Sequence, residues 1–181
     1  MPTSNPSILE IDIVNDISAF GTLFELDIAA QKTENSYLFP LESEKEFRQL
    51  LTEHDESHTF AMQDPATGRF MGYICLAAAP ERHFAPFTFA HDIPPTKLAS
   101  IPSLVISPDF QRRGCGLQLM AHTKSFAKAV GYQAIALHVQ MANEPAMRLY
   151  LKSGFRLYDA CRVELPYGRK GGPRVPMAKH L

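Results

Sequence analysis

The segment from Ser107 to Leu117 constrains the fold more than any other part of the chain. It follows a short apolar run at residues 102–107, which predicts a buried strand, and it precedes a helical pattern at residues 117–130. Gly114 and Gly116 stand between the two. The first turn of a helix leaves backbone N–H groups unpaired and carries partial positive charge, and glycines let a ligand approach the backbone closely. This order of elements predicts an anion site where the helix begins.

Arg112 and Arg113 would add full positive charges beside that helix start. The segment lacks the Gly-Lys-Ser/Thr ending of a Walker loop, and it does not fit the dinucleotide-binding GxGxxG fingerprint. The residues alone therefore predict a phosphate or pyrophosphate ligand of another kind. The alternative is a glycine-containing turn with two solvated arginines.

A second defined pattern follows a predicted strand at residues 134–139. Asn143 is placed to cap a helix that has Pro145 in its first turn, where a missing N–H costs nothing. The helix should stop at Ser153 and Gly154. Tyr150 lies seven residues after Asn143, about two helical turns further along the same face.

The rest of the chain alternates between strand and helix signals. Asp16 is the expected cap of the first helix, and Ser43 with Glu46 forms a predicted capping box for the second. Strands are expected at residues 9–14, 58–63, 70–79, 155–165 and 175–180, helices at 17–31 and from 43 onward, a turn at 64–68 and a long loop at 80–100.

The two patterns together resemble the GNAT superfamily of acyl-CoA-dependent N-acetyltransferases. The resemblance rests on Gln111-x-x-Gly114-x-Gly116 and on the later Asn143-to-Phe155 helix segment with its Leu-Tyr and Gly-Phe pairs. It implies an α/β (α+β) fold: a mixed, mostly antiparallel sheet of about seven strands, flanked by about four helices. The central pair of strands, residues 102–107 and 134–139, would splay apart.

The resemblance also implies acetyl-CoA as a cosubstrate. Its pantetheine arm would lie between the splayed strands, and its pyrophosphate would rest on the amides of residues 112–117. The implied cofactor-binding residues are Leu104, Val105, Ile106, Gln111, Arg112, Arg113, Gly114, Cys115, Gly116, Leu117, Asn143, Ala146 and Tyr150. Cys115 is interpreted as a small residue that fits the loop, since no histidine partner pattern supports a nucleophilic role.

The resemblance gives Tyr150 the role of general acid, which protonates the coenzyme A thiolate as the amine displaces it. The alternative is a core tyrosine whose hydroxyl is satisfied. A general base is also needed, because an alkyl ammonium has a pKa of about 10. Family members with a glutamate on the strand before the phosphate loop differ from this chain, in which residues 101–107 contain no acid.

Candidates for that base are His138 on the second splayed strand, His91 or Asp92 in the long loop, Glu25 on the first helix, or a chain of waters. His138 is the predicted catalytic partner of Tyr150. Strand alternation could nevertheless turn its ring to the face opposite the cleft.

Composition narrows the class of protein. The formal net charge of -1, from 18 basic and 19 acidic residues, argues against a nucleic-acid partner. Three scattered cysteines form no CxxC pair, and no metal site is expected. A polar N-terminus and the lack of a long apolar stretch predict a cytoplasmic protein with no membrane partner. We expect a single domain over residues 1–181.

The leading hypothesis is an enzyme that moves an acetyl group from acetyl-CoA to a primary amine without a covalent enzyme intermediate. A small-molecule acceptor is favoured, because the loop at 80–100 is long enough to cover the acceptor site. The alternatives are a protein or peptide acetyltransferase, and a non-catalytic acyl-CoA-binding module on the same fold. The sequence names no acceptor and leaves a homodimer open.

Overall fold

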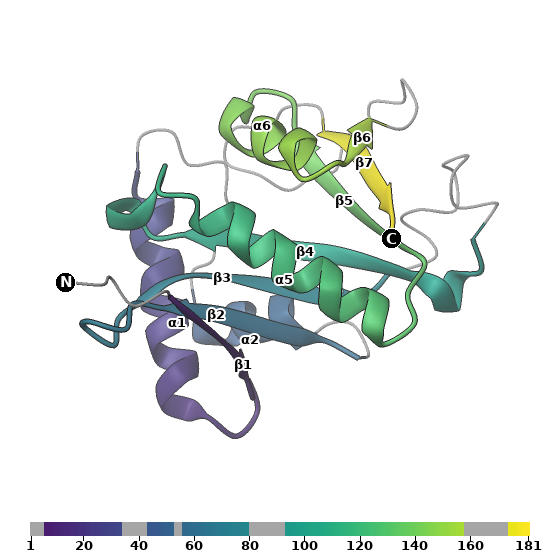
Figure 1. Cartoon of the computed structure of the whole chain (residues 1–181). Coiled ribbons are helices and arrows are strands. Elements are labelled where there is room, and N and C mark those ends of the chain that lie inside the picture. The colour runs from purple at the N-terminus through teal and green to yellow at the C-terminus, as the bar shows by residue number, and fades with distance from the viewer. Residues whose placement is uncertain (1–5, 34–42, 53–55, 80–92, 158–173) are drawn as a thin grey trace.

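The computed structural model describes residues 6–33, 43–52, 56–79, 93–157 and 174–181, which form a seven-stranded sheet with helices on both faces (Figure 1). The strands are β1 (Ser7–Ile11), β2 (His58–Gln63), β3 (Phe70–Ala78), β4 (Leu98–Ile106), β5 (Ala134–Gln140), β6 (Arg156–Leu157) and β7 (Arg174–His180). The helices are α1 (Ile17–Gln31), α2 (Glu44–Thr52), α5 (Cys115–Ala129) and α6 (Glu144–Lys152), with short 3-10 turns η1 (Pro95–Lys97) and η2 (Pro108–Phe110).

The sheet has the order β1-β2-β3-β4-β5-β7-β6. Among the described strands, β4 and β5 pair in parallel and every other neighbouring pair is antiparallel. The predicted fold class, a mixed and mostly antiparallel sheet with flanking helices, is confirmed.

The central strands β4 and β5 are joined at one end only. Their pairs are Leu98 with Ala134, Ala99 with Ile135 and Ser100 with Ala136. Beyond Ser100, β4 continues to Ile106 beside β3, while β5 pairs along its whole length with β7. Pro102 follows the last shared pair and has no N–H to donate to a ladder. The predicted splay between these strands is confirmed.

Two cores lie on opposite faces of the sheet. Helices α1 and α2 bury Phe20, Leu23 and Phe47 against one face. Helix α5 covers the other face with residues such as Leu119 and Met120, in a cluster that also includes residues of α6. In Figure 1, α5 crosses in front of β3 and β4, and α6 lies beside β5. The N-terminus of α5 and the side of α6 therefore lie on the same face of the parting strands.

Several predicted boundaries were wrong. The first strand ends at Ile11 because the Asp12 carboxylate accepts the N–H groups of Val14 and Asn15, each at 3.0 Å, and turns the chain. The predicted loop at 80–100 includes the first residues of β4, since Leu98 is buried in a small cluster with Ile93 and residues of β5 and β7. Residues 80–92 of that loop lie outside the described residues.

Other boundaries were close. Asp16 caps α1 by accepting the N–H of Ala19 at 2.9 Å, and the Ser43 hydroxyl oxygen accepts the N–H of Glu46 at 3.3 Å, as the capping signals predict. Helix α5 begins at Cys115, two residues before its predicted start. Of the strand predicted at 155–165, β6 covers Arg156–Leu157, and residues 158–173 lie outside the described residues. No helix in the described parts is long and apolar enough to cross a bilayer.

Gly72 permits the close approach of β3 to the free end of β4. It pairs with Ile106, and a Cβ at this position would lie 2.6 Å from the carbonyl oxygen of Val105 and 2.7 Å from Cδ1 of Ile106. We therefore expect Gly72→Ala to lower the free energy of unfolding by about 1–3 kcal/mol, the usual cost of overpacking. Urea denaturation followed by circular dichroism measures this change.

Gly21 in α1 is the matched control, because a Cβ there would meet nothing within 4 Å. Gly21→Ala should raise the free energy of unfolding by about 0.5–1 kcal/mol, since alanine loses less backbone entropy in a helix. Equal stability of the Gly72→Ala variant and the wild type would contradict the packing argument.

Candidate active site

A cavity of about 690 Å³ opens where β4 and β5 part. Its walls come from the end of β4, the loop before α5, the first residues of α5 and one side of α6, and also from Ala30 and Thr33 at the end of α1. Helices α1 and α6 pack on opposite faces of the sheet, so elements from both faces contribute to the cavity wall. Its volume lies within the range of ligand-binding pockets.

Nearly all the residues predicted to bind a cofactor line this cavity. They are Leu104, Val105, Ile106, Gln111, Arg112, Gly114, Cys115, Gly116, Leu117, Asn143, Ala146 and Tyr150, and Arg113 is the one predicted residue that does not. Two distant parts of the sequence, one before α5 and one in α6, thus meet around a single space.

The start of α5 has the backbone geometry of an anion site. Gly114 is its N-cap, with φ +84°, and no side chain caps this end of the helix. Arg112 also has a positive φ, +60°, which costs about 1–2 kcal/mol for a non-glycine residue. The N–H of Leu117 already donates to the Gly114 carbonyl oxygen at 3.0 Å, so the amides available to an anion lie before it.

Packing against α6 requires a glycine at position 116, and the sequence did not indicate this. A Cβ there would lie 3.1 Å from Cδ2 of Leu149 on α6. Glycine at this position therefore lets the first turn of α5 approach α6, and the two helices close one side of the cavity.

Cys115, between the two glycines, is 2% exposed and packs in the core cluster. Burial raises the pKa of its thiol. Because the thiolate is the nucleophilic form, this environment disfavours covalent catalysis by Cys115.

Tyr150 lies on the α6 side of the cavity and is only 8% exposed. Its helix is fixed at the N-terminus by Asn143, whose Oδ1 accepts the N–H of Ala146 at 3.2 Å, and its ring lies 6.0 Å from that of Phe155. Burial raises the pKa of the Tyr150 phenol to about 12. A phenol in this environment keeps its proton at neutral pH and can act as a proton donor.

The predicted base candidates do not line the cavity where the structure describes them. His138 pairs with Pro176 of β7, and its strand neighbours Leu137 and Val139 belong to the cluster that holds Tyr150, so alternation directs His138 to the opposite face. Glu25 is exposed on α1. His91 and Asp92 lie outside the described residues.

Sequence reasoning missed several lining residues. On α6 these are Pro145, Arg148, Leu149 and Lys152, and elsewhere they are Ala30, Thr33 and Phe110. The α6 set follows helical spacing from Pro145, and this period was the signal that could have identified it. Ala30 of α1, and Thr33 just after that helix, come from the far side of the sheet and have no local signal.

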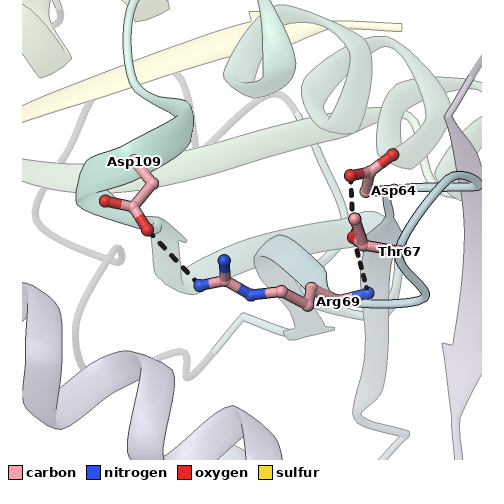
Figure 2. Close-up of polar contacts among 4 residues, drawn as sticks. All are labelled: Asp64, Thr67, Arg69 and Asp109. Atoms are coloured by element: carbon pink, nitrogen blue, oxygen red, sulfur yellow. Dashed lines mark hydrogen bonds and ion pairs between the residues drawn. The ribbon is translucent and has the colours of Figure 1, made fainter.

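The loop before α5 is held to the turn between β2 and β3, as Figure 2 shows. Arg69 Nη2 lies 3.3 Å from Asp109 Oδ2, and the Arg69 N–H donates to the Thr67 hydroxyl oxygen at 3.4 Å. The guanidinium groups of Arg69 and Arg113 both lie over the Phe110 ring, at 5.9 and 5.4 Å from its centroid. Arg113 therefore packs on Phe110, which accounts for its place outside the cavity lining.

Within the described residues, no group of three or more His, Cys, Asp or Glu side chains is arranged to hold a metal ion.

Comparisons with solved structures find the same fold. The ribosomal-protein-S18-alanine N-acetyltransferase from Escherichia coli matches with a TM-score of 0.71 and 18% identity, over 97% of this chain and 94% of that one. The spermidine N-acetyltransferase from Vibrio cholerae, in complex with CoA and spermine, gives a TM-score of 0.69 and 18% identity, over 98% and 96%. A GCN5-related N-acetyltransferase from Kribbella flavida gives 0.68 and 19%, over 97% and 98%.

No curated protein sequence matches the chain. A family model does: that of the Acetyltransferase (GNAT) family matches residues 24–155, which include the parting strands β4 and β5 and the helices α5 and α6 that follow them. This match covers most of the chain, and the chain therefore belongs to the GNAT family of acetyltransferases.

Proposed function

We propose that this protein, as a single domain over residues 1–181, transfers an acetyl group from acetyl-CoA directly to the primary amine of a small molecule. The observation that carries the proposal is the cavity, which runs from the uncapped start of α5 through the parting of β4 and β5 to Tyr150. A long cofactor with a diphosphate at one end and a thioester at the other suits this arrangement of charge and shape.

The residues at the start of α5 would hold the diphosphate. Backbone amides before Leu117, the helix dipole and the Arg112 side chain offer positive charge at that end of the cavity. Arg148 and Lys152 on α6 add two more cations to the lining, although Arg148 also pairs with Glu144 at 2.6 Å. This donor set fits the several negative charges of coenzyme A.

The free edge of β4 would bind the pantetheine arm. Past Ser100 the backbone of β4 has no β5 partner, so its N–H and C=O groups can pair with amides of a ligand, as an added strand would. The Ile106 carbonyl is the exception, because it accepts the side-chain amide of Gln111 at 3.2 Å. Main-chain groups of β4 alternate between β3 and the opening, and Val105 pairs with Tyr73 of β3, so Leu104 is the expected main-chain contact. Val105 remains an expected contact as a residue of the cavity lining.

Tyr150 would supply the proton to the departing thiolate. The amine nitrogen would attack the thioester carbonyl carbon, the C–S bond would break, and the thiolate sulfur would take the phenolic proton of Tyr150. The attacking nitrogen loses one proton as the amide forms, and that proton restores the Tyr150 phenol. Since burial of Cys115 disfavours a thiolate there, direct transfer to the amine is the simpler course.

The proposed acceptor is a primary amine. The E. coli and V. cholerae neighbours are named for a protein alanine and for spermidine, both of which present amines. Purified protein incubated with acetyl-CoA and a panel of small amines, with an alanine-ended peptide alongside, should release free thiol with a small amine. Turnover with the peptide alone would make it a peptide acetyltransferase, and CoA binding without any turnover would make it a binding module.

Tyr150→Phe should lower kcat by about 100-fold or more, because the leaving thiolate then lacks its proton donor. Affinity for acetyl-CoA, measured by titration calorimetry, should change little. Tyr132→Phe is the control, since the Tyr132 hydroxyl donates to Glu56 and does not face the cavity. A Tyr150→Phe variant with wild-type kcat would refute the acid role.

The pH profile of the wild type supplies an independent check. An acid works while protonated, so activity due to Tyr150 is lost only as pH rises through its pKa of about 12. We expect no fall in kcat between pH 7 and pH 10 in stopped-flow measurements on freshly shifted enzyme. A decline centred near pH 8 or 9 would assign the acid to another group.

Arg112→Gln should weaken CoA binding by about tenfold, the usual loss when one charge-assisted hydrogen bond is removed. Arg156→Gln makes the same change of charge at an exposed position of β6 outside the cavity lining and should leave the Kd unchanged. Isothermal titration with CoA at two salt concentrations measures both. If both substitutions weakened CoA binding equally, the net charge of the protein would attract CoA, and the loop that carries Arg112 would have no specific role.

A further inference from the structure

A buried carboxylate lies on the α1 face of the sheet, and it has no part in the transfer of the acetyl group or in protonation of the thiolate. Asp27 of α1 is 2% exposed. Its Oδ2 accepts the Tyr73 hydroxyl of β3 at 2.5 Å, and its Oδ1 accepts the side-chain amide of Gln31 at 2.6 Å. The Tyr73 oxygen in turn lies 3.1 Å from the hydroxyl oxygen of Ser103 on β4. Three elements thus contribute to one hydrogen-bonded chain.

The direction of these hydrogen bonds follows from the number of protons. Tyr73 has one hydroxyl proton, and an ionised Asp27 can only accept, so that proton lies in the bond to Asp27. The Tyr73 oxygen is then the acceptor for Ser103, whose own oxygen keeps lone pairs for a further donor. The chain is therefore ordered from Ser103 to Asp27, ready to pass a proton inward.

The outer end of this chain lies beside the opening between the strands. Ser103 comes after the last pair between β4 and β5, and it is two residues from Val105, which lines the cavity and points to the same face. Asp27 lies three residues before Ala30, which lines the cavity from α1. Ser103 retains 9% exposure. Tyr150, by contrast, belongs to the core cluster on the other face.

We propose that Asp27 is the final acceptor of the proton that the substrate ammonium must lose, and that Ser103 and Tyr73 conduct it there from the α1 side of the opening. The proposal rests on the acetyltransferase function proposed above and supplies the base that it lacks.

Each proton in this transfer is accounted for. Ser103 is next to the lining residue Leu104 and is not itself in the cavity lining, so a water would link it to the substrate. The substrate N–H⁺ gives its proton through that water to the Ser103 oxygen, the Ser103 proton passes to the Tyr73 oxygen, and the Tyr73 proton passes to Asp27 Oδ2. Ser103 and Tyr73 end as they began, Asp27 becomes a neutral carboxylic acid, and the substrate becomes a neutral amine. Asp27 returns its proton to water after the product leaves, since acetyl transfer from thioester to ammonium releases one proton overall.

The surroundings of Asp27 suit a proton acceptor. Burial raises the pKa of its carboxyl, which makes the carboxylate more basic, while the hydrogen bonds from Tyr73 and Gln31 act in the opposite direction. Burial and the nearby Asp27 charge raise the pKa of Tyr73 well above 10, so this phenol passes a proton on without remaining ionised.

Among the described residues, the groups packed against this site from other elements are mostly uncharged, and Arg48 of α2 lies over the Phe20 ring of α1. Helix α2 presents the Phe47 ring to Tyr73 at 5.8 Å between centroids, β3 also carries the buried Cys75 thiol, and β4 presents Ser103. No lysine, arginine or histidine of the described residues forms an ion pair with Asp27.

The test compares pH profiles of kcat/KM for the wild type, Asp27→Asn and Ser103→Ala, with the amine that the wild type acetylates best. At pH 7 both variants should be about 100-fold slower, the lower end of the usual contribution from general bases. The deficit should shrink about tenfold with each pH unit, because an alkyl ammonium with a pKa of about 10 then loses its proton to bulk water. A purely structural defect would not recover with pH.

Ser103→Ala keeps the proposal testable if Asp27→Asn fails to fold, because the Asp27–Tyr73 pair survives in it. Glu56→Gln is the matched control: it weakens another tyrosine–carboxylate hydrogen bond, 3.2 Å from Tyr132, away from the cavity, and should keep the wild-type profile. Parallel pH profiles for Ser103→Ala and the wild type, with no deficit at pH 7, overturn the proposal. If the wild type acetylates no amine, the proposed function itself falls, and this inference falls with it.

Discussion

The structure depends on one interruption in a sheet. β4 and β5 share three residue pairs and then separate, because each has a different second neighbour, β3 or β7, and because Pro102 offers no N–H where the ladder would continue. Every functional feature is arranged around that interruption. The helix that follows β4 begins at its edge, the helix that follows β5 presents Tyr150 to it, and the end of α1 reaches it from the far face.

The two faces of the opening differ in chemistry. The α5–α6 face carries the uncapped helix start, Arg112 and Lys152, which suit a polyanionic cofactor. The α1 face carries Asp27, buried with a hydroxyl chain leading from β4. A proton donor with a raised pKa on one side and a carboxylate with a raised pKa on the other match the two proton transfers that acetylation of an ammonium requires.

Local signals allowed most of this to be predicted from the sequence. Asp16, Asn143 and Gly131 mark helix ends through capping and left-handed backbone, which depend on neighbouring residues only. The pairing that forms the Asp27 chain could not be predicted, because α1, β3 and β4 are distant in sequence and only the sheet register brings Tyr73 opposite Val105, next to Ser103. The start of β4 was missed for a similar reason: its burial comes from β5 and β7, and its own residues have no regular period. The catalytic role of His138 stays a prediction. Period-two alternation was known from the sequence but its phase was not, and the structure turns His138 away from the face that holds Tyr150.

The sheet can also be regarded as two leaves, β1 to β4 and β5 with β7 and β6, joined by a hinge of three residue pairs. On one side, Gly116 of α5 lies so close to Leu149 of α6 that an added Cβ would come within 3.1 Å of Cδ2 of Leu149. A ligand that forms hydrogen bonds to the facing edges of both β4 and β5 would supply the interstrand hydrogen bonds that the protein itself lacks there. Binding of the cosubstrate in the cleft would then also join the two parts of the sheet. The enzyme would complete its own β-sheet only when the cosubstrate is present.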